Sequence, residues 1–569
     1  MRNRFLSWAW LTLALAGAAL AQEETAVDET EIFSETIDVN VVNLEVFVTD
    51  KKGNSIKGLS VDDFEITEDG RPVAITNFYV VEEGIPVGTP QPETVAAAAL
   101  PVGDALPETV APLALPEDQR LYLIVYIDNF NIRPFNRNRV FRRIREFLTE
   151  KVGNEDRVML VSYDRSLNYR HPFTSQPDLI AQQLFELEDL TGHAVSADSD
   201  RRDILRAIAE AESIGQVDWR VRTYAESMYN DLSFSVDAMS ELVDSLGGVP
   251  GRKAMLYVSD GLPATAADDM YHALHRQFQD TTVLSTSQEF NANRLYKRLT
   301  SKANENRVTF YTLDAAGLRM PGGSDVSYAT ADEAGIASFV DSIYISNLQA
   351  PLLQLAEETG GQAIINSNDV GDGLTKIATD FRTYYSLGYI PAHSGDGRYY
   401  RVEVKLKEKR KGVRVRHRTG YRDKPVSARM SDGAMATLVY GLEDNPLDVA
   451  IRVEASRPDE DETSRYFLVD IVVDIPIGSI ELIPTGDFHV GKTKIFFVAL
   501  DEEGSTSGVS EVPLDLRIPD DKIASAVTQV FPYRVTLRMR RGPHRLAVGV
   551  YDEIGARKSF LSRGFNVGS

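Results

Sequence analysis

Apolar, strand-like runs alternate with amphipathic helical segments between residues 121 and 385, and this alternation limits the fold more than any other feature of the sequence. The run "LYLIVYID" at 121–128 is apolar almost throughout, which is typical of a strand covered on both faces. The segment "NRNRVFRRIREFLTEKV" that follows places its apolar residues on one helical face. Further strand-like runs at 156–164, 253–261 and 308–315 repeat the pattern. The alternation predicts a mainly parallel sheet that helices cover on both faces.

Shifts in composition mark the other domains. Alternating strands with turn signals indicate a small β-module, and a stretch rich in Pro and Ala indicates a semi-extended linker. The last part of the chain has strands and turns at the spacing of a β-sandwich. The predicted order is a disordered segment at 22–36, the β-module at 37–83, the linker at 84–118, an α/β domain at 119–422 with a helical insertion at about 196–247, and a β-sandwich-like domain at 423–569. Strands within 384–422 are expected to close the α/β domain.

The first 21 residues have the features of a secretory signal peptide. Arg2 and Arg4 precede an apolar run, and Ala19 and Ala21 form a small-residue cleavage site. A retained membrane anchor is the alternative, although the apolar core is shorter than the ~20 residues that a spanning helix needs. We expect cleavage after Ala21, export to the periplasm or the cell exterior, and no transmembrane segment in the mature chain.

Charge and composition argue against several classes of function. The formal net charge of −23 becomes −25 when Arg2 and Arg4 leave with the signal peptide. So large an acidic excess argues against nucleic-acid binding, which depends on neutralising phosphates, and it favours solubility and attraction for cations. The absence of cysteine excludes disulfides, thiolate metal sites and cysteine nucleophiles. No G-x-S-x-G, H-E-x-x-H or Walker sequence is present, so we predict no catalytic residues.

Two aspartates end neighbouring apolar strands and form the main candidate site. Asp128 follows "LYLIVYI" and Asp260 follows "AMLYVS", so the two carboxylates should meet at one edge of a parallel sheet. Two close carboxylates repel unless a cation, a basic residue or hydrogen bonds compensate them. Either a metal ion or a salt bridge from Arg133 or Arg137 could do so.

Three other clusters carry weaker signals. The basic cluster after Asp128 could meet an anionic partner or form a solvated helix face that pairs with local acids such as Glu146 and Glu150. The stretch "ADSDRRD" lacks the Gly and Glu spacing of a calcium loop and is read as a solvated loop. His272 and His275 lie at helical spacing without an evident third ligand. The basic cluster consists of Arg133, Arg137, Arg139, Arg142, Arg143 and Arg145, and the acids of the second stretch are Asp198, Asp200 and Asp203.

Several stretches together resemble the von Willebrand factor type A (VWA)-related proteins of the acidobacterial type. The similar stretches are "LSVDDFEITEDGRPVAITNF", "DNFNIRPFNRNRV", "LYVSDGLP" and "YYSLGYIPAHSGDGRYYRVEVKLK". The resemblance covers roughly residues 37–422 and implies a doubly wound, Rossmann-like α/β VWA fold that binds ligands at the carboxyl ends of its strands.

The resemblance also implies a metal site, which this sequence matches only in part. VWA domains that bind Mg²⁺ carry Asp-x-Ser-x-Ser in the first loop, with a Thr and a second Asp from later loops. Asp128 and Asp260 match the two aspartates, whereas Phe130 and Ile132 stand at the serine positions. The amide of Asn131 could replace one serine, and Thr191 lies in the region of the threonine. The predicted ligands of this degenerate site for Mg²⁺ or another divalent cation are Asp128, Asn131, Thr191 and Asp260.

These observations predict an exported, non-enzymatic protein that binds or adheres to a protein or a surface polymer. The binding surface should centre on Asp128, Asn131 and Asp260, with Arg133 and Arg137 as candidate contacts to the partner. The helical insertion and a loop at 315–345 are expected to shape it. A structural scaffold of an envelope complex and a metal-dependent hydrolase are the alternatives from other functional classes.

Overall fold

The computed structural model describes residues 41–87, 120–153, 155–320, 331–408, 410–459 and 466–568. These residues belong to two compact units, one formed by Asn40–Asp244 with Pro250–Asp423 and the other built mainly from Lys424–Ser569. The predicted signal peptide at 1–21, the predicted disordered segment at 22–36 and residues 88–118 of the predicted linker lie outside the described residues.

A six-stranded sheet forms the centre of the first unit. Numbered by their order along the chain within this sheet, the strands lie in the order 3-2-1-4-5-6, which is a doubly wound arrangement. All neighbouring pairs are parallel except the pair that involves the edge strand β8. The strands are β6 (Leu121–Asp128), β7 (Arg157–Tyr163), β8 (Leu167–Thr174), β9 (Arg252–Ser259), β10 (Val308–Asp314) and β11 (Ala363–Ile364).

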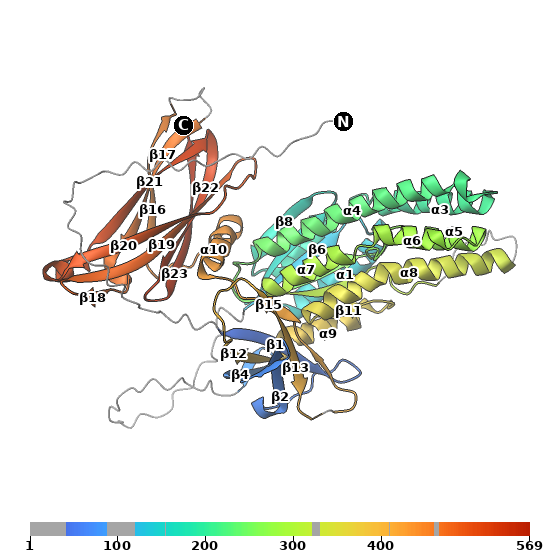
Figure 1. The fold of residues 1–569 in the computed structure, drawn as a ribbon, viewed down its shortest axis with the longest axis horizontal. Helices are drawn as coiled ribbons and strands as arrows, with labels where there is room; N and C mark the ends of the chain where they lie inside the picture. Colours follow the sequence, from blue (N-terminus) through green and yellow to red (C-terminus); the bar gives the residue numbers. More distant parts are fainter. Residues whose placement is uncertain are drawn as a thin grey trace. The chain divides into compact units, whose positions relative to one another are not determined.

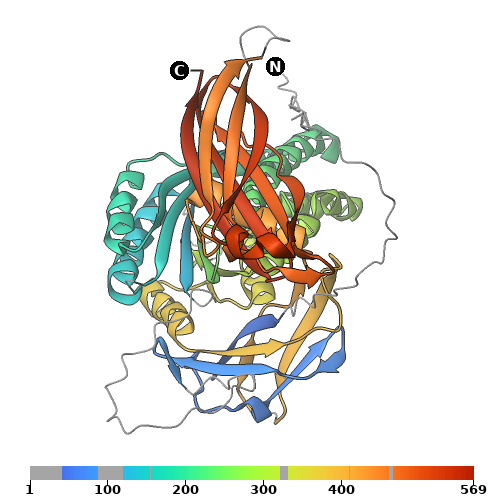
Figure 2. The ribbon, with the colours of Figure 1, turned by 90° about the vertical axis from the view of Figure 1, so that its left-hand side faces the viewer.

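Helices cover both faces of this sheet because its central strands are apolar on both sides (Figures 1 and 2). Leu123, Val125 and Ile127 of β6 share one core with α1, α2 and α9. Helices α7 and α8 pack against β10 instead. The helices are α1 (Pro134–Lys151), α2 (Pro177–Leu187), α7 (Asn293–Glu305), α8 (Ala331–Thr359) and α9 (Val370–Arg382).

A second group of helices has its own apolar core beside the sheet. Val221, Met270, Tyr271 and Val340 are buried in this core, which joins the predicted insertion to the connection after β9 and to α8. The predicted insertion is helical, and "ADSDRRD" lies within its first helix rather than in a loop. The additional helices are α3 (Ala194–Glu210), α4 (Asp218–Ser245), α5 (Asp268–Phe278) and α6 (Thr282–Ser287).

The prediction of a loop at 315–345 is wrong for its second half, because α8 begins at Ala331 and continues through Pro351. The stretch "LQAPLLQLAEETGG" predicts a helix only from residue 348, and proline, which has no N–H, normally breaks a helix. In the structure the carbonyl of Asn347, which Pro351 cannot bond, accepts the N–H of Ala264 at 3.0 Å. The neighbouring carbonyl of Leu348 accepts the N–H of Leu262 at 3.1 Å. A tertiary hydrogen bond thus replaces the one that the proline removes, and the second joins the same turn of the helix to the connection after β9.

The N-terminal β-module is built from two distant parts of the chain. Leu44 pairs with Leu387, and Ile66 pairs with Val404, so the strands of 384–422 complete this module and do not extend the α/β sheet. A segment of under fifty residues buries too little apolar surface to stabilise two sheets alone. The sheet orders are β14-β1-β12-β4-β5 and β15-β13-β2-β3. The strands are β1 (Val42–Thr49), β2 (Phe64–Glu68), β3 (Arg71–Val73), β4 (Asn77–Glu82), β5 (Ile85–Val87), β12 (Tyr384–Tyr389), β13 (Tyr399–Leu406), β14 (Arg414–Arg416) and β15 (Gly420–Arg422).

The C-terminal unit consists of two antiparallel sheets that share one apolar core. Alternating residues such as Val469, Ile471 and Val473 point into this core, as the sandwich prediction requires. Helix α10 (Val426–Tyr440) packs against β19 and β22. The strands are β16 (Ala450–Pro458), β17 (Tyr466–Pro476), β18 (Ile483–Thr485), β19 (Phe488–Asp501), β20 (Ser510–Pro519), β21 (Val530–Arg540), β22 (Gly542–Asp552) and β23 (Arg557–Val567).

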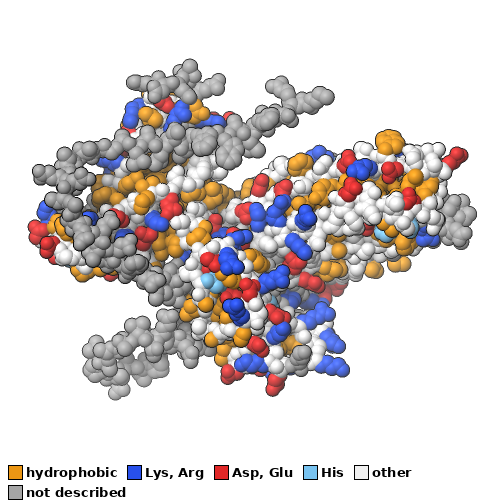
Figure 3. Space-filling view, in the orientation of Figure 1, with side chains coloured by type: hydrophobic (Ala, Val, Ile, Leu, Met, Phe, Trp, Pro, Cys, Tyr) orange, Lys and Arg blue, Asp and Glu red, His pale blue; other side chains and the backbone are white. Residues whose placement is uncertain are grey.

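Two general properties bear on function. No helix in the described part of the chain is both long and apolar enough to cross a membrane. On the face shown in Figure 3, acidic and basic side chains are interspersed with hydrophobic ones, so the acidic excess does not form a field of one sign there.

Candidate functional site

Asp128 lies at the carboxyl end of β6 and is fully buried. Its carboxylate accepts hydrogen bonds from the backbone N–H of Asn131 at 3.1 Å and from the Asn131 side chain at 2.9 Å. The hydroxyl of Tyr257 donates to the same carboxylate. Burial raises the pKa of Asp128, although these hydrogen bonds lower it. The carboxylate is therefore held by protein donors from β9 and from its own loop.

Asp260 follows β9 and is compensated by an arginine. Its Oδ2 accepts hydrogen bonds from the backbone N–H and the guanidinium of Arg133, both at 3.0 Å, and from the amide of Asn136 at 2.9 Å. Burial raises the pKa of Asp260, while the Arg133 charge lowers it. Of the two arginines that the sequence offers as partners, Arg133 forms the salt bridge.

Arg133 also connects the site to the helical group. Its guanidinium forms two hydrogen bonds of 2.6 Å with the carboxylate of Asp198 in α3. Burial lowers the pKa of Arg133, but the hydrogen bond to Asp198 and the charges of both aspartates outweigh this and raise it. In the same helix, Arg201 pairs with Asp269 of α5 at 2.7 Å and with Asp341 of α8 at 3.0 Å. Ion pairs thus extend from the sheet edge into three helices.

A third aspartate at this edge was missed in the sequence. Asp314 ends β10 and is buried, and its carboxylate accepts hydrogen bonds from Arg319 at 2.7 Å and from Gln349 at 2.9 Å. The guanidinium of Arg319 also donates to the carbonyl of Asp260. The signal was present, because "VTFYTLD" ends in Asp just as the strand before Asp128 does. No local sequence pattern predicts that Arg319 and Gln349 contact Asp314.

The positions of the missing serines are filled by apolar side chains. Ile132 is fully buried, and Phe130 is buried with its ring stacked on His193 at 4.4 Å. The loop that contains Thr191 does lie beside this segment, since a Cβ on Gly192 would approach the carbonyl of Ile132 to 2.8 Å. The Thr191 side chain, however, is exposed, and only its carbonyl is used, accepting the Asn129 amide at 2.9 Å.

These residues do not fit a magnesium ion. Mg²⁺ needs near-octahedral oxygen ligands at ~2.1 Å. Both oxygens of Asp128 accept protein donors, and Oδ2 of Asp260 accepts three. The other oxygen of Asp260 is buried without a hydrogen bond among the described residues, but one oxygen is too few for a site. The structure therefore does not gather Asp128, Asn131, Thr191 and Asp260 into a ligand set, and guanidinium groups supply the positive charge.

The prediction that Arg137 contacts a partner is wrong, because its side chain is fully buried. It donates hydrogen bonds to the carbonyls of Glu188 and Leu190 at 2.9 and 2.8 Å and to the side chain of Asn129. Burial lowers the pKa of Arg137. This arginine holds the loop after α2 against the start of α1, where no partner can reach it.

The remaining clusters have local partners. Arg143 pairs with Glu146 at 2.7 Å, and Arg145 pairs with Glu188 at 2.5 Å, as a helix face that bonds nearby acids would. His275 bonds the carbonyl of Asp280 at 3.0 Å. In the part of the chain that the structure describes, the His, Asp and Glu side chains close enough to share a metal ion are those of His393, Asp396 and Asp423, which lie in the β-module.

Comparisons with known proteins give only distant likenesses. The chain matches no known family profile and no curated protein. Similar solved structures include an aerotolerance-related membrane protein from Bacteroides fragilis, at 11% identity and a TM-score of 0.22, and BatB from Bacteroides thetaiotaomicron, at 13% and 0.20; each likeness covers 46% of this chain and 98% of the other. The pilus adhesin SpaC from Lactobacillus rhamnosus GG has 9% identity and a TM-score of 0.23 over 79% of this chain and 52% of its own. These likenesses do not assign the chain to a family.

Proposed function

We propose that the chain is an exported, non-enzymatic binding protein of the VWA kind, which recognises a protein partner at the carboxyl edge of its α/β sheet without a bridging metal ion. The doubly wound strand order and the sequence resemblance at residues 37–422 support the VWA assignment. Open α/β sheets bind ligands at this edge. The salt bridges of Arg133 and Arg319 support binding that needs no metal, since they already compensate the acids there.

Exposed apolar side chains beside these salt bridges are the observation on which the proposal depends. Phe135 is 78% exposed and adjoins Asn136, which bonds Asp260. Leu318 and Met320 are 56% and 75% exposed and flank Arg319, which bonds the carbonyl of Asp260. Each of these exposed side chains adjoins in sequence a residue that bonds Asp260, and exposed large apolar side chains near a ligand-binding edge favour a protein-binding surface over a solvated one.

The test is retention of a partner by the mature chain, residues 22–569, from the envelope fraction of the source organism. We expect the double substitution Phe135→Ser and Met320→Ser to lower retention at least tenfold, because truncating interface anchors commonly costs ~2 kcal/mol or more. Chelation with EDTA should leave retention by the unaltered chain unchanged. Circular dichroism checks that the variant is folded.

The matched control is Val530→Ser in β21, where an apolar side chain is 50% exposed in the C-terminal unit. It should retain the partner fully. Loss of the partner with Val530→Ser but not with the double substitution would contradict the proposal and favour a scaffold that binds through the C-terminal unit. Loss on chelation would contradict the metal-independent mode.

A further inference from the structure

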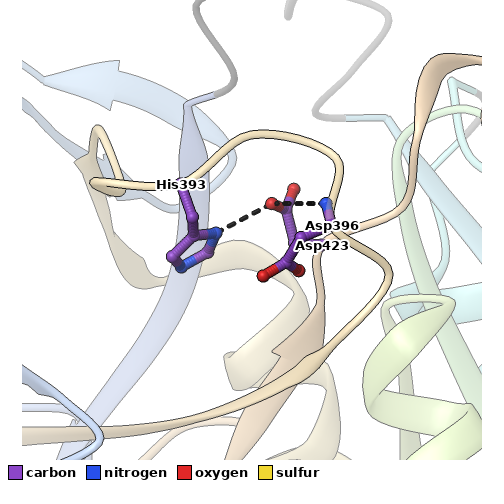
Figure 4. A group of neighbouring side chains, drawn as sticks. All are labelled: His393, Asp396 and Asp423. Atoms are coloured by element: carbon purple, nitrogen blue, oxygen red, sulfur yellow. Dashed lines mark hydrogen bonds and ion pairs between the residues drawn. The ribbon is translucent and has the colours of Figure 1, made fainter.

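Three side chains of the β-module converge on one point (Figure 4). His393 and Asp396 lie in the connection between β12 and β13, and Asp423 follows β15 directly. Nδ1 of His393 is 2.8 Å from Oδ2 of Asp423, and one ligand atom from each of the three residues lies within 4.8 Å of the others. Asp423 is fully buried, His393 is partly buried and Asp396 is exposed. The cluster is therefore anchored in the module and open to solvent on one side.

The second nitrogen of His393 is oriented by a buried carboxylate. Nε2 lies 3.3 Å from Oε2 of Glu68, the last residue of β2. Glu68 is itself held by the hydroxyls of Tyr389 and Tyr421, which each donate to its Oε1 at 2.7 Å. A metal-binding histidine typically donates its other ring N–H to such a carboxylate, which determines the tautomer and strengthens the ligand. The contact of Nε2 with Glu68 does not involve Asp396 or Asp423, and it orients Nδ1 to bind a cation.

Aromatic contacts hold the imidazole ring in one orientation. Tyr400 stacks on His393 with ring centres 3.6 Å apart and planes inclined by 7°. The hydroxyl of the same tyrosine donates to the carboxylate of Asp396. One side chain thus positions two members of the cluster.

We propose that His393, Asp396 and Asp423 form a binding site for a divalent transition-metal ion such as Zn²⁺. One imidazole nitrogen and two carboxylate oxygens suit zinc and similar ions, with water in the remaining position. Zinc binds nitrogen and oxygen at ~2.0–2.2 Å, so two ligands of a tetrahedral ion lie about 3.4 Å apart. Nδ1 and the Asp423 oxygen, now 2.8 Å apart, would separate by about 0.6 Å when the ion binds between them. The exposed Asp396 already places a carboxylate oxygen within 4.8 Å of the other two ligand atoms.

Such an ion would join the connection between β12 and β13 to the end of β15, and His393 would link it to Glu68. Glu68 belongs to the N-terminal strands, whereas His393 and Asp423 belong to the segment that completes the sheets. An ion that binds only the folded state stabilises that state. The ion would thus fix the segment that completes the β-module and would act on the N-terminal strands only through the contact of His393 with Glu68, a role separate from recognition at the carboxyl edge of the α/β sheet.

The test is calorimetric titration of Zn²⁺ into the metal-stripped mature chain. We expect one saturable site, an affinity at least 100-fold lower in His393→Gln, and an affinity 10–100-fold lower in Glu68→Gln, which alters only the residue behind the ligand. Asp396→Asn changes an exposed side chain and should also weaken binding without unfolding the module. Co²⁺ bound in place of Zn²⁺ should give the visible absorption of cobalt with nitrogen and oxygen ligands. This absorption should be absent in His393→Gln.

The matched control is His489→Gln. His489 forms a similar contact with a single aspartate, Asp520, at 2.9 Å. Among the described residues, however, no third His, Asp or Glu lies close enough to share a metal ion with this pair. Zinc binding should be unchanged in this variant. The absence of a saturable site in the unaltered chain would overturn the proposal. So would zinc affinities of folded Asp396→Asn and His393→Gln that equal the affinity of the unaltered chain. His393 would then be an imidazole that only bridges Asp423 and Glu68.

Discussion

At the residue scale, the charge of Asp260 is compensated by an arginine, which lies where a metal ion would have to bind. The guanidinium of Arg133 contacts Asp260 at 3.0 Å and Asp198 at 2.6 Å, so it bridges two acids from different elements. Such partly buried pairs add little stability when intact, but removing one partner leaves an uncompensated charge. The carboxyl edge of the sheet should therefore depend on Arg133 rather than on a metal ion.

Substituting Arg133 by Met should lower the free energy of unfolding by about 3 kcal/mol near neutral pH. Burial already raises the pKa of Asp260 above 3.8, and Arg133 opposes that rise. Without Arg133 the folded state binds the Asp260 proton more tightly than the unfolded state does, so stability falls as pH rises above the unfolded value. The loss should therefore grow between about pH 4 and pH 7. Urea unfolding followed by circular dichroism measures it.

Adding Asp260→Asn to Arg133→Met should remove most of this pH dependence, because no carboxyl group is left to ionise there. Arg143→Met, which removes an exposed pair with Glu146, serves as the control and should leave unfolding unchanged. A loss in Arg133→Met that is independent of pH would show that the pair with Asp260 is not its cause.

At the element scale, the connection after β9 and the helix α8 determine each other's structure. Pro351 leaves the carbonyl of Asn347 without a helical donor, and the connection supplies one. The side chain of Asn347 in turn bonds the backbone of Thr265 at 2.9 Å in both directions. The close approach requires glycine at 261, where φ is +115° and a Cβ would lie 2.8 Å from atoms of Leu348.

Substituting Gly261 by Ala should therefore destabilise the protein by about 2–4 kcal/mol, since strain at positive φ adds to overpacking against α8. Gly70 is the matched control, because it also has positive φ, +78°, but has no atom within 4 Å of the added Cβ. Gly70→Ala should cost only about 1 kcal/mol. Equal losses in the two variants, measured by urea unfolding, would mean that the contact with α8 contributes nothing.

At the scale of the whole molecule, the α/β domain and the β-module are not separable in sequence. Strands β12 and β13 leave the α/β domain and pair with β1, β2 and β4. Their core includes Leu44 and Val46 from the first part of the chain and Tyr385 and Leu387 from the second. Neither part can bury these side chains alone.

Removal of residues 41–87 should thus leave a chain that aggregates, because β12 and β13 lose their strand partners and expose apolar edges. We expect residues 120–423 to be largely insoluble and residues 41–423 to be monomeric and folded, as measured by size-exclusion chromatography and circular dichroism. Supplying residues 41–87 as a separate peptide should recover soluble protein. A soluble, cooperatively unfolding 120–423 fragment would contradict this view of the module.

Local patterns were sufficient to predict part of the fold and part of the site. The apolar run ending at Asp128 predicts a strand buried on both faces, and the spacing of Val140, Phe141 and Ile144 predicts the helix that covers it. Asp260 was likewise found from the strand before it. Each of these predictions depends on residues that are near one another in the chain.

The remaining features depend on contacts between distant residues. The bond of Arg133 to Asp260 spans 127 residues, and that of Arg307 to Glu45 spans 262. The partners of Arg137, the helix through Pro351 and the pairing of β1 with β12 likewise involve no local periodicity. The periodicity of apolar residues and the turn residues indicate which side chains are buried and which backbone conformation is adopted locally. Whether a metal ion or a guanidinium compensates the acids at the sheet edge depends instead on which side chains the fold brings together. That choice was made by the tertiary structure.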